Sequence, residues 1–173
     1  MVYIISDAIK MADGLNMMRQ SALLNQPLFV TGHPLLPELS PHLFILPDGK
    51  EAWSEYLAAS WGNSWGIFAT TNASFDECQK HFERVLIVKA SDGELLFFRY
   101  YDPRVLRTFL AGCSTAQLKT FFGPVKVFTV EDRDPAYAIS FWLQNNALCS
   151  NRIPATDFFA RLTSKDYLEK QKV

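Results

Sequence analysis

The sequence predicts a mixed domain, α/β or α+β, in which helices flank a sheet of about five or six strands. Apolar runs typical of strands alternate along the chain with segments whose apolar residues recur at helical spacing. Capping residues and turn residues separate these segments. With 173 residues and 49% hydrophobic content, the chain is long enough to bury a proper core without disulfide or metal support.

The first third of the chain predicts two strands, each followed by a helix. Residues 2–6 and 42–46 are apolar runs of strand length, whereas residues 8–24 and 51–60 carry apolar side chains at mainly helical spacing. Residues 27–41 contain four prolines and a glycine, which interrupt regular structure. We therefore expect this intervening segment to be irregular.

A strand at residues 66–71 and a helix at residues 75–84 are predicted next. Ser74 and Glu77 fit a capping box, since the serine oxygen accepts a first-turn amide while the glutamate accepts the serine amide. This pair fixes the start of the helix.

Two apolar runs, residues 84–89 and 94–99, are predicted to pair as a hairpin. They flank Asp92-Gly93, one of the strongest short hairpin signals, because both residues tolerate positive φ. A two-residue loop would place Val88 opposite Phe97. Because neither run alternates cleanly, we expect central strands that are covered on both faces.

Arg99 and Asp102 end this hairpin and begin the next helix. Arg99 shares a predicted sheet face with Phe97, so a buried guanidinium there needs a carboxylate or helix-end carbonyls as its partner. Asp102 supplies an N-cap oxygen, and Pro103 fits the first helical position. We expect loss of Arg99 to destabilise the fold more than loss of Asp102.

The remaining elements define a boundary after residue 130. Gly112 closes one helix, Ser114 caps another, and Gly123-Pro124 ends it before a strand at residues 125–130. Residues 1–130 are therefore predicted to form an α/β platform domain. The remainder, residues 131–173, is predicted to be a small, mainly helical C-terminal lobe or arm.

Aromatic residues are concentrated in this C-terminal part. Buried aromatic anchors contribute disproportionately to the energy of protein interfaces, so these residues are candidates for binding a protein partner. Trp142 and Phe159 are the better candidates, because each is adjacent to another aromatic residue and points elsewhere. Phe141 and Phe158 could instead pack on the platform. The full set of candidates is Tyr137, Phe141, Trp142, Phe158 and Phe159.

Several motifs resemble one known family, the effector-chaperone (adaptor) domain of the bacterial type VI secretion system, long described only as a domain of unknown function. The resemblance covers roughly residues 2 to 130. Its core lies at residues 98–106, around Asp102-Pro103-Arg104. The other matching strings are residues 3–8, 27–29, 40–46, 61–66, 92–93, Gln117 and residues 121–124.

The resemblance implies a chaperone that holds a cognate toxic effector, or its N-terminal segment, and helps to load it onto the VgrG spike without being secreted itself. From the residues themselves we expect no catalysis and no cofactor, because acids, bases and metal ligands are not clustered in the sequence. The motif residues are expected to be mainly structural, and they are Trp61, Trp65, Arg99, Tyr101, Asp102, Pro103, Arg104, Phe122, Gly123 and Pro124.

Composition and motifs argue against several other classes of protein. A net charge of −1 and a pI near 6.3 offer no electrostatic footprint for nucleic acid. The sequence shows neither a signal peptide nor an apolar run of membrane-spanning length, which predicts a cytoplasmic protein without membrane contact. Phosphate-binding loops are absent, so nucleotide binding is not expected. No small-molecule substrate is expected either, because the sequence shows no clustered catalytic residues. The three histidines are far apart in sequence, which predicts no metal site.

Two rival functions remain open from the sequence. The string Gly62-Asn63-Ser64-Trp65-Gly66 matches the G-x-S-x-G pattern of hydrolases, which would make Ser64 a nucleophile. That motif needs a strand before the serine and a helix after it, whereas here the predicted order is reversed. The other rival is a structural subunit without cargo.

Overall fold

The computed structural model describes residues 1–11, 24–28, 40–45, 50–89 and 92–162. Its elements, in chain order, are β1 (Val2–Ser6), α1 (Ala8–Met11), β2 (Leu24–Pro27), β3 (His42–Ile45), α3 (Lys50–Ser60), β4 (Gly66–Thr71), α4 (Phe75–Val85), β5 (Ile87–Lys89), β6 (Leu95–Phe97), α5 (Pro103–Gly112), α6 (Thr115–Phe122), β7 (Val125–Glu131), β8 (Tyr137–Gln144), β9 (Ala147–Pro154) and α7 (Ala155–Leu162).

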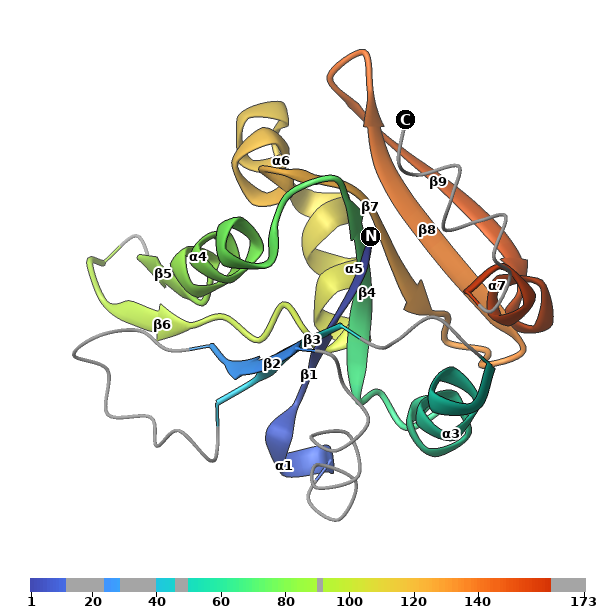
Figure 1. The fold of residues 1–173 in the computed structure, drawn as a ribbon. Helices are drawn as coiled ribbons and strands as arrows, with labels where there is room; N and C mark the ends of the chain where they lie inside the picture. The colour runs from blue at the N-terminus through green and yellow to red at the C-terminus, as the bar shows by residue number, and fades with distance from the viewer. Residues whose placement is uncertain (12–23, 29–39, 46–49, 90–91, 163–173) are drawn as a thin grey trace.

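Within the described residues, seven strands form one antiparallel sheet in the order β2-β3-β1-β4-β7-β8-β9 (Figure 1). A separate two-stranded ribbon, β5–β6, protrudes from the body beside α4. The predicted mixed class is confirmed as an α+β fold, because the strands are antiparallel and the helices pack against the sheet rather than connecting parallel strands.

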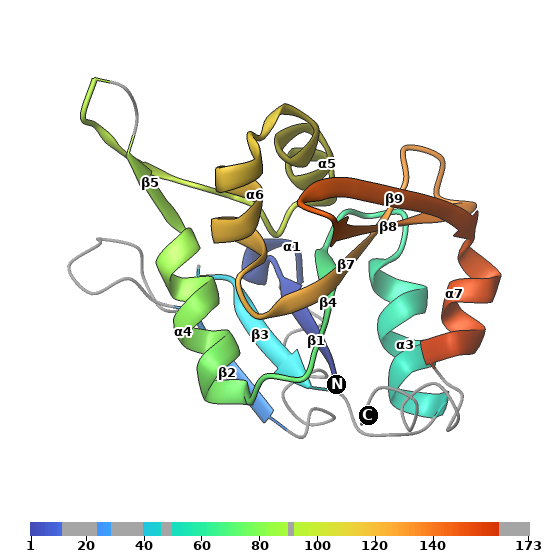
Figure 2. The same cartoon turned by 90° about the horizontal axis from the view of Figure 1, so that it is seen from above.

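Helices cover both faces of the sheet, as Figure 2 shows from above. Side chains alternate along β1, so Tyr3 and Ile5 enter one core, with α4, α5 and α6, whereas Val2 and Ile4 enter the other, with α3 and α7. The fold therefore has three layers, with the sheet in the middle.

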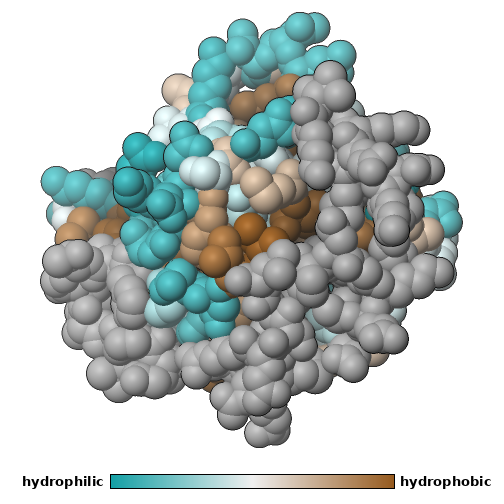
Figure 3. Space-filling view, viewed as in Figure 1, coloured by the Kyte–Doolittle hydropathy of each residue, from teal (hydrophilic) through white to brown (hydrophobic). Residues whose placement is uncertain are grey.

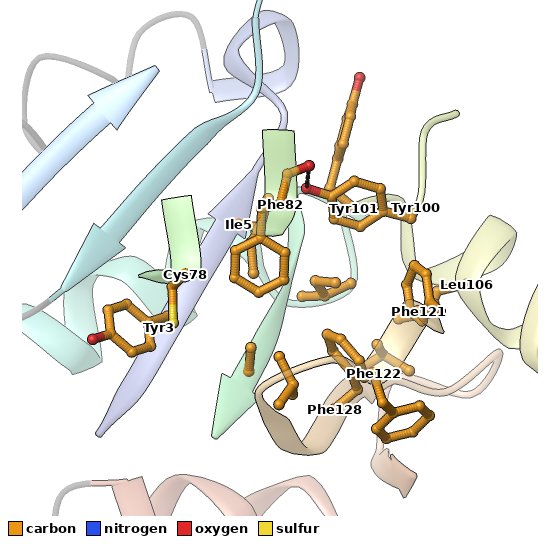
Figure 4. Packing of buried hydrophobic residues seen from close by; sticks show 14 of the residues in the cluster. Tyr3, Ile5, Cys78, Phe82, Tyr100, Tyr101, Leu106, Phe121, Phe122 and Phe128 are labelled. Atoms are coloured by element: carbon orange, nitrogen blue, oxygen red, sulfur yellow. Dashed lines mark hydrogen bonds between the residues drawn. The ribbon is translucent and has the colours of Figure 1, made fainter. Parts of the chain in front are cut away.

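Aromatic rings fill the larger core (Figure 4). Tyr100 is fully buried and stacks on Phe82, with ring centroids 6.0 Å apart, and its hydroxyl donates to the Phe82 carbonyl at 3.1 Å. Phe121 meets Phe128 of β7 at 5.2 Å. Tyr100 thus anchors the chain segment that follows β6 to the helix α4.

Three predicted helix starts are confirmed. Ser74 and Glu77 form a reciprocal capping box at α4. Asp102 caps α5, with Pro103 in its first turn. Ser114 caps α6, where Gln117 completes a second capping box. Each of these starts depends on contacts within three residues, which is why local sequence predicts them.

The predicted hairpin exists, but two expectations about it are wrong. Val88 lies opposite Leu96 rather than Phe97, because the connection spans residues 90–94 instead of two residues. The strands are not covered on both faces either, since Val88, Leu95 and Leu96 are 38%, 65% and 44% exposed. Figure 3 shows hydrophobic residues at the left margin, where β5 and β6 lie in Figure 1.

The strand β2 was not predicted. Leu24 belongs to it rather than to a helix, and Pro27 is its last residue rather than the start of an irregular segment. A proline is tolerated there because β2 is an edge strand, so its missing amide leaves no ladder bond unmade. The rest of the predicted helix, residues 12–23, and His33 lie outside the described residues.

The described residues of the C-terminal part include the helix α7 and also a hairpin, β8–β9, that the sequence analysis did not predict. Asn145 and Asn146 join its strands with φ of 51° and 64°, which suits a tight hairpin turn. Because β8 pairs with β7, the two sides of the predicted boundary after residue 130 share one sheet. The functional division at that boundary stays a prediction.

Candidate functional site

An open groove of about 840 Å³ lies between α5 and the corner where β7 leads into β8. The turn that follows α3 forms its end. Motif residues far apart in the sequence meet around this groove, so we treat it as the candidate site. Its walls include Gly62, Ser64, Arg104, Arg107, Glu131 and Phe141.

Asp102 organises the charged residues at one side of the groove. Its side chain is only 3% exposed, and its Oδ1 accepts the Arg104 amide at 3.0 Å and Arg104 Nε at 2.9 Å. Its Oδ2 accepts Arg104 Nη2 at 2.6 Å and Lys10 Nζ at 3.3 Å. Burial raises the pKa of Asp102, but these hydrogen bonds and Lys10 outweigh it and lower the pKa to about 2. The carboxylate is therefore held in its charged form.

Arg99 finds the carboxylate partner that the sequence required, but in a different setting. Its Nη2 donates to Asp7 Oδ2 at 2.6 Å, and Asp7 also accepts the amides of Ile9 and Lys10, which begins α1. The expectation of a buried guanidinium between strands is wrong. Arg99 follows β6, and its side chain is 49% exposed.

The Ser64 hydroxyl is fixed by a buried carboxylate. It donates to Glu131 Oε1 at 2.7 Å, while the Gly62 amide donates to Oε2 at 2.7 Å. A helix precedes Ser64 and a strand follows it, as the sequence predicted. Among the described residues, the histidines lie elsewhere: His42 is in β3, and His81 contacts the Phe121 carbonyl. The Glu131 carboxylate therefore holds the turn at Gly62 and Ser64 in place through two hydrogen bonds.

Trp61 and Trp65 anchor this turn to the smaller core. Trp61 Nε1 donates to the Pro135 carbonyl at 2.6 Å, which links the turn to the corner between β7 and β8. The Trp61 ring meets Phe159 edge-on, with centroids 4.9 Å apart. The remaining motif residues Tyr101, Pro103 and Phe122 are buried, and Gly123 and Pro124 lead from α6 into β7.

The five C-terminal aromatic candidates lie in different surroundings. Phe141 and Phe158 are buried in the two cores, and Phe159 packs against Trp61. The Arg152 guanidinium lies over the Tyr137 ring at 3.4 Å. Trp142 is half-buried and lines a second hollow, of about 490 Å³, between α6 and the strands β7 and β8. Of the five, only Trp142 lines this second hollow.

Sequence reasoning missed the roles of four residues: Arg107 and Glu131 line the groove, whereas Asp7 and Lys10 bond to residues beside it. Asp7 directly precedes a helix, so its capping role had a local signal. The others act through contacts with residues distant in sequence. Lys10 donates to the Ser64 carbonyl at 2.8 Å, and Arg107 Nη1 donates to the Glu131 carbonyl. No local pattern identifies such partners.

Within the described ranges, no group of three or more His, Cys, Asp and Glu side chains is arranged to hold a metal ion. In that same part of the chain, no helix is both long enough and apolar enough to cross a membrane.

Comparison with known proteins gives one match. A family model described as "Domain of unknown function (DUF4123)" matches residues 2–120, which is more than half of the chain. No curated protein and no solved structure matches the sequence.

Proposed function

The chain belongs to the DUF4123 family, the type VI secretion effector-adaptor family that its motifs resemble, and from this premise we propose that it binds a cognate toxic effector and helps to load it onto the VgrG spike. In this proposal it acts in the cytoplasm, before secretion, as a non-catalytic adaptor. The family match over residues 2–120 is the observation that carries the proposal.

The chemistry of the groove is consistent with a binding role. A serine nucleophile needs a base that removes its proton, and in the described residues the Ser64 hydroxyl meets only the Glu131 carboxylate. Both carboxylate oxygens of Glu131 also hold the turn in place, since the second one accepts the Gly62 amide. We therefore assign Ser64 to the architecture of the turn.

We assign the main effector contact to the C-terminal part, residues 131–173, with the platform at residues 1–130 as its support. Trp142 supports this assignment, because it is half-buried beside a hollow and takes no part in either core cluster. Large aromatic side chains at the centre of an interface account for much of the binding energy. Phe159 ranks behind it, since the Trp61 ring already contacts it.

The test measures affinity for the effector encoded beside this gene, by biolayer interferometry with purified full-length chains. Truncation after residue 130 is unsuitable, because it would remove the partner strand of β7. Trp142→Ala is expected to weaken binding by about thirtyfold. Leu96→Ser, which removes an exposed apolar side chain of the platform, serves as the matched control and is expected to leave affinity unchanged.

The outcomes separate the hypotheses. Loss of affinity in Leu96→Ser with full affinity in Trp142→Ala would move the contact to the β5–β6 ribbon. Absence of binding by the wild-type chain to both the effector and the VgrG spike would refute the adaptor function and favour a structural subunit without cargo. Circular dichroism spectra of each variant check that the fold is intact.

A further inference from the structure

Two arginines of the groove form no ion pair within 4 Å among the described residues. Arg107 projects from α5, is half-buried, and donates to a backbone carbonyl, that of Glu131. Burial lowers the pKa of Arg107, although the nearby carboxylates of Asp132 and Glu131 raise it. Arg133 lines the same groove and is exposed. Four other cations of the described part each have a carboxylate within 4 Å, and they are Lys10, Arg99, Arg104 and Arg152.

The acidic side chains nearest to these two arginines are already engaged. Glu131 accepts the Ser64 hydroxyl and the Gly62 amide, both at 2.7 Å. Asp132 accepts Arg152 Nε and the Arg133 amide, both at 2.6 Å. The two guanidinium groups therefore keep donors that can bind an acid supplied from outside, and a planar guanidinium binds a carboxylate through two parallel hydrogen bonds.

Both polar and apolar residues line the groove around the arginines. The polar ones include Ser64, Thr108, Ser150 and the already engaged Glu131 and Asp132. Ala111 of α5 and Ile139 and Phe141 of β8 line it beside the arginines. Its volume of about 840 Å³ lies within the range of ligand-binding pockets and holds two or three side chains of a peptide. A cationic rim beside an apolar floor is complementary to an acidic residue next to an apolar one.

We propose that this groove binds an extended acidic segment of a partner protein. A carboxylate of the segment pairs with Arg107 and Arg133, and the neighbouring apolar side chain lies on Ile139 and Phe141. The proposal rests on the adaptor function in that the partner is the protein effector, and it adds the chemistry by which the effector is recognised.

The test uses two fluorescently labelled peptides with glycine and serine flanks, one with the centre Glu-Leu-Glu-Leu and the other with Gln-Leu-Gln-Leu. Fluorescence anisotropy with the full-length chain is expected to show at least about tenfold tighter binding of the glutamate peptide. Its affinity is also expected to fall as salt rises from about 50 to about 300 mM, because screening weakens ion pairs near the surface.

Charge-removing variants locate the contact. Arg107→Gln and Arg133→Gln are each expected to weaken binding of the glutamate peptide by about fivefold or more. Arg84→Gln is the matched control, because it removes the same charge from an exposed arginine on α4, away from the groove. Arg107 also holds the Glu131 carbonyl, so circular dichroism checks its variant. Arg133→Gln, at an exposed residue, decides the outcome if the other does not fold.

Three results would overturn the proposal: no binding of the glutamate peptide at about 1 mM, equal affinity for both peptides, or equal losses in the Arg84→Gln and Arg133→Gln variants. Full effector affinity in the Arg133→Gln and Arg107→Gln variants would also overturn it, while leaving the adaptor function standing. Peptide binding that depends on both arginines, in a chain that binds no effector, would support the groove and refute the adaptor function.

Discussion

Replacing Gly123 with alanine is expected to destabilise the fold by about 2–5 kcal/mol, for two separable reasons. Gly123 follows α6 with φ of 49° and ψ of −117°, a conformation that residues with a Cβ rarely adopt. An added Cβ would also lie 2.6 Å from His81 Nδ1 and closer still to its Cε1. His81 cannot swing away easily, because its Nε2 is 2.8 Å from the Phe121 carbonyl and the ring is buried.

The two contributions have similar size. A residue held in a sparsely populated backbone conformation costs about 1–3 kcal/mol. Forcing an extra methyl group into a filled core costs a further 1–3 kcal/mol or so. In the double variant His81→Ala, Gly123→Ala, the steric part of the destabilisation should disappear, because the ring that the added methyl group would meet is absent. We therefore expect a coupling of about 1–3 kcal/mol between the two sites.

Urea unfolding followed by circular dichroism at neutral pH measures all four members of this cycle. Gly112→Ala is the matched control: its Cβ would meet no atom within 4 Å, and the substitution lies in the last turn of α5. Because alanine favours helix over glycine, this control should be neutral or more stable by up to about 1 kcal/mol. A Gly123→Ala variant as stable as wild type, or a cycle without coupling to His81, would refute the reasoning.

Three further predictions concern single residues. Asp102→Ala should lower the free energy of unfolding by about 2 kcal/mol, and Arg99→Ala should lower it by less than about 1 kcal/mol. This order is the reverse of the one predicted from sequence, because the Arg99 side chain is half exposed. Urea midpoints of the two variants measure the difference. Burial lowers the pKa of His81, so as pH falls the unfolded chain binds the proton before the folded chain does. The free energy of unfolding should therefore decrease as pH drops below about 6.5. In urea titrations, a His81→Ala variant should lose this pH dependence. Ser64→Ala should lower the free energy of unfolding by about 1 kcal/mol, because it removes the hydrogen bond to Glu131, but it should preserve effector delivery. If a fluorophosphonate probe labels the wild type and not this variant, the rival hydrolase function is established.

The sequence predicts elements whose limits are set by local chemistry. Helix starts at Ser74, Asp102 and Ser114 follow from side chains that bond amides two or three residues away. Apolar runs at β1, β4 and β7 are long enough to indicate strands. The β8–β9 hairpin also has a local signal in the sequence, because Asn145-Asn146 separates two runs of strand length.

The arrangement of the candidate site was not predictable in the same way. Asp7 and Arg99 are 92 residues apart, and Ser64 and Glu131 are 67 apart, so only the tertiary fold brings each pair together. One sequence permits many pairings of scattered charges, and no spacing rule selects among them. The predicted register of the β5–β6 ribbon is wrong for a related reason. A change in the length of the loop shifts every pair of facing residues.

The central position of β4 affects how the chain is made. β4 pairs with β1, which precedes it, and with β7, which follows it. About 50 residues of sequence separate β4 from β7. At a synthesis rate of about 5–20 residues per second, one edge of β4 therefore stays unpaired for roughly 3–10 s during translation. Helices α4, α5 and α6 emerge in this interval and can cover a face of β4, but they offer no backbone partners for its edge. Because free strand edges promote aggregation, the strand order concentrates the risk of misassembly in the seconds before β7 is translated.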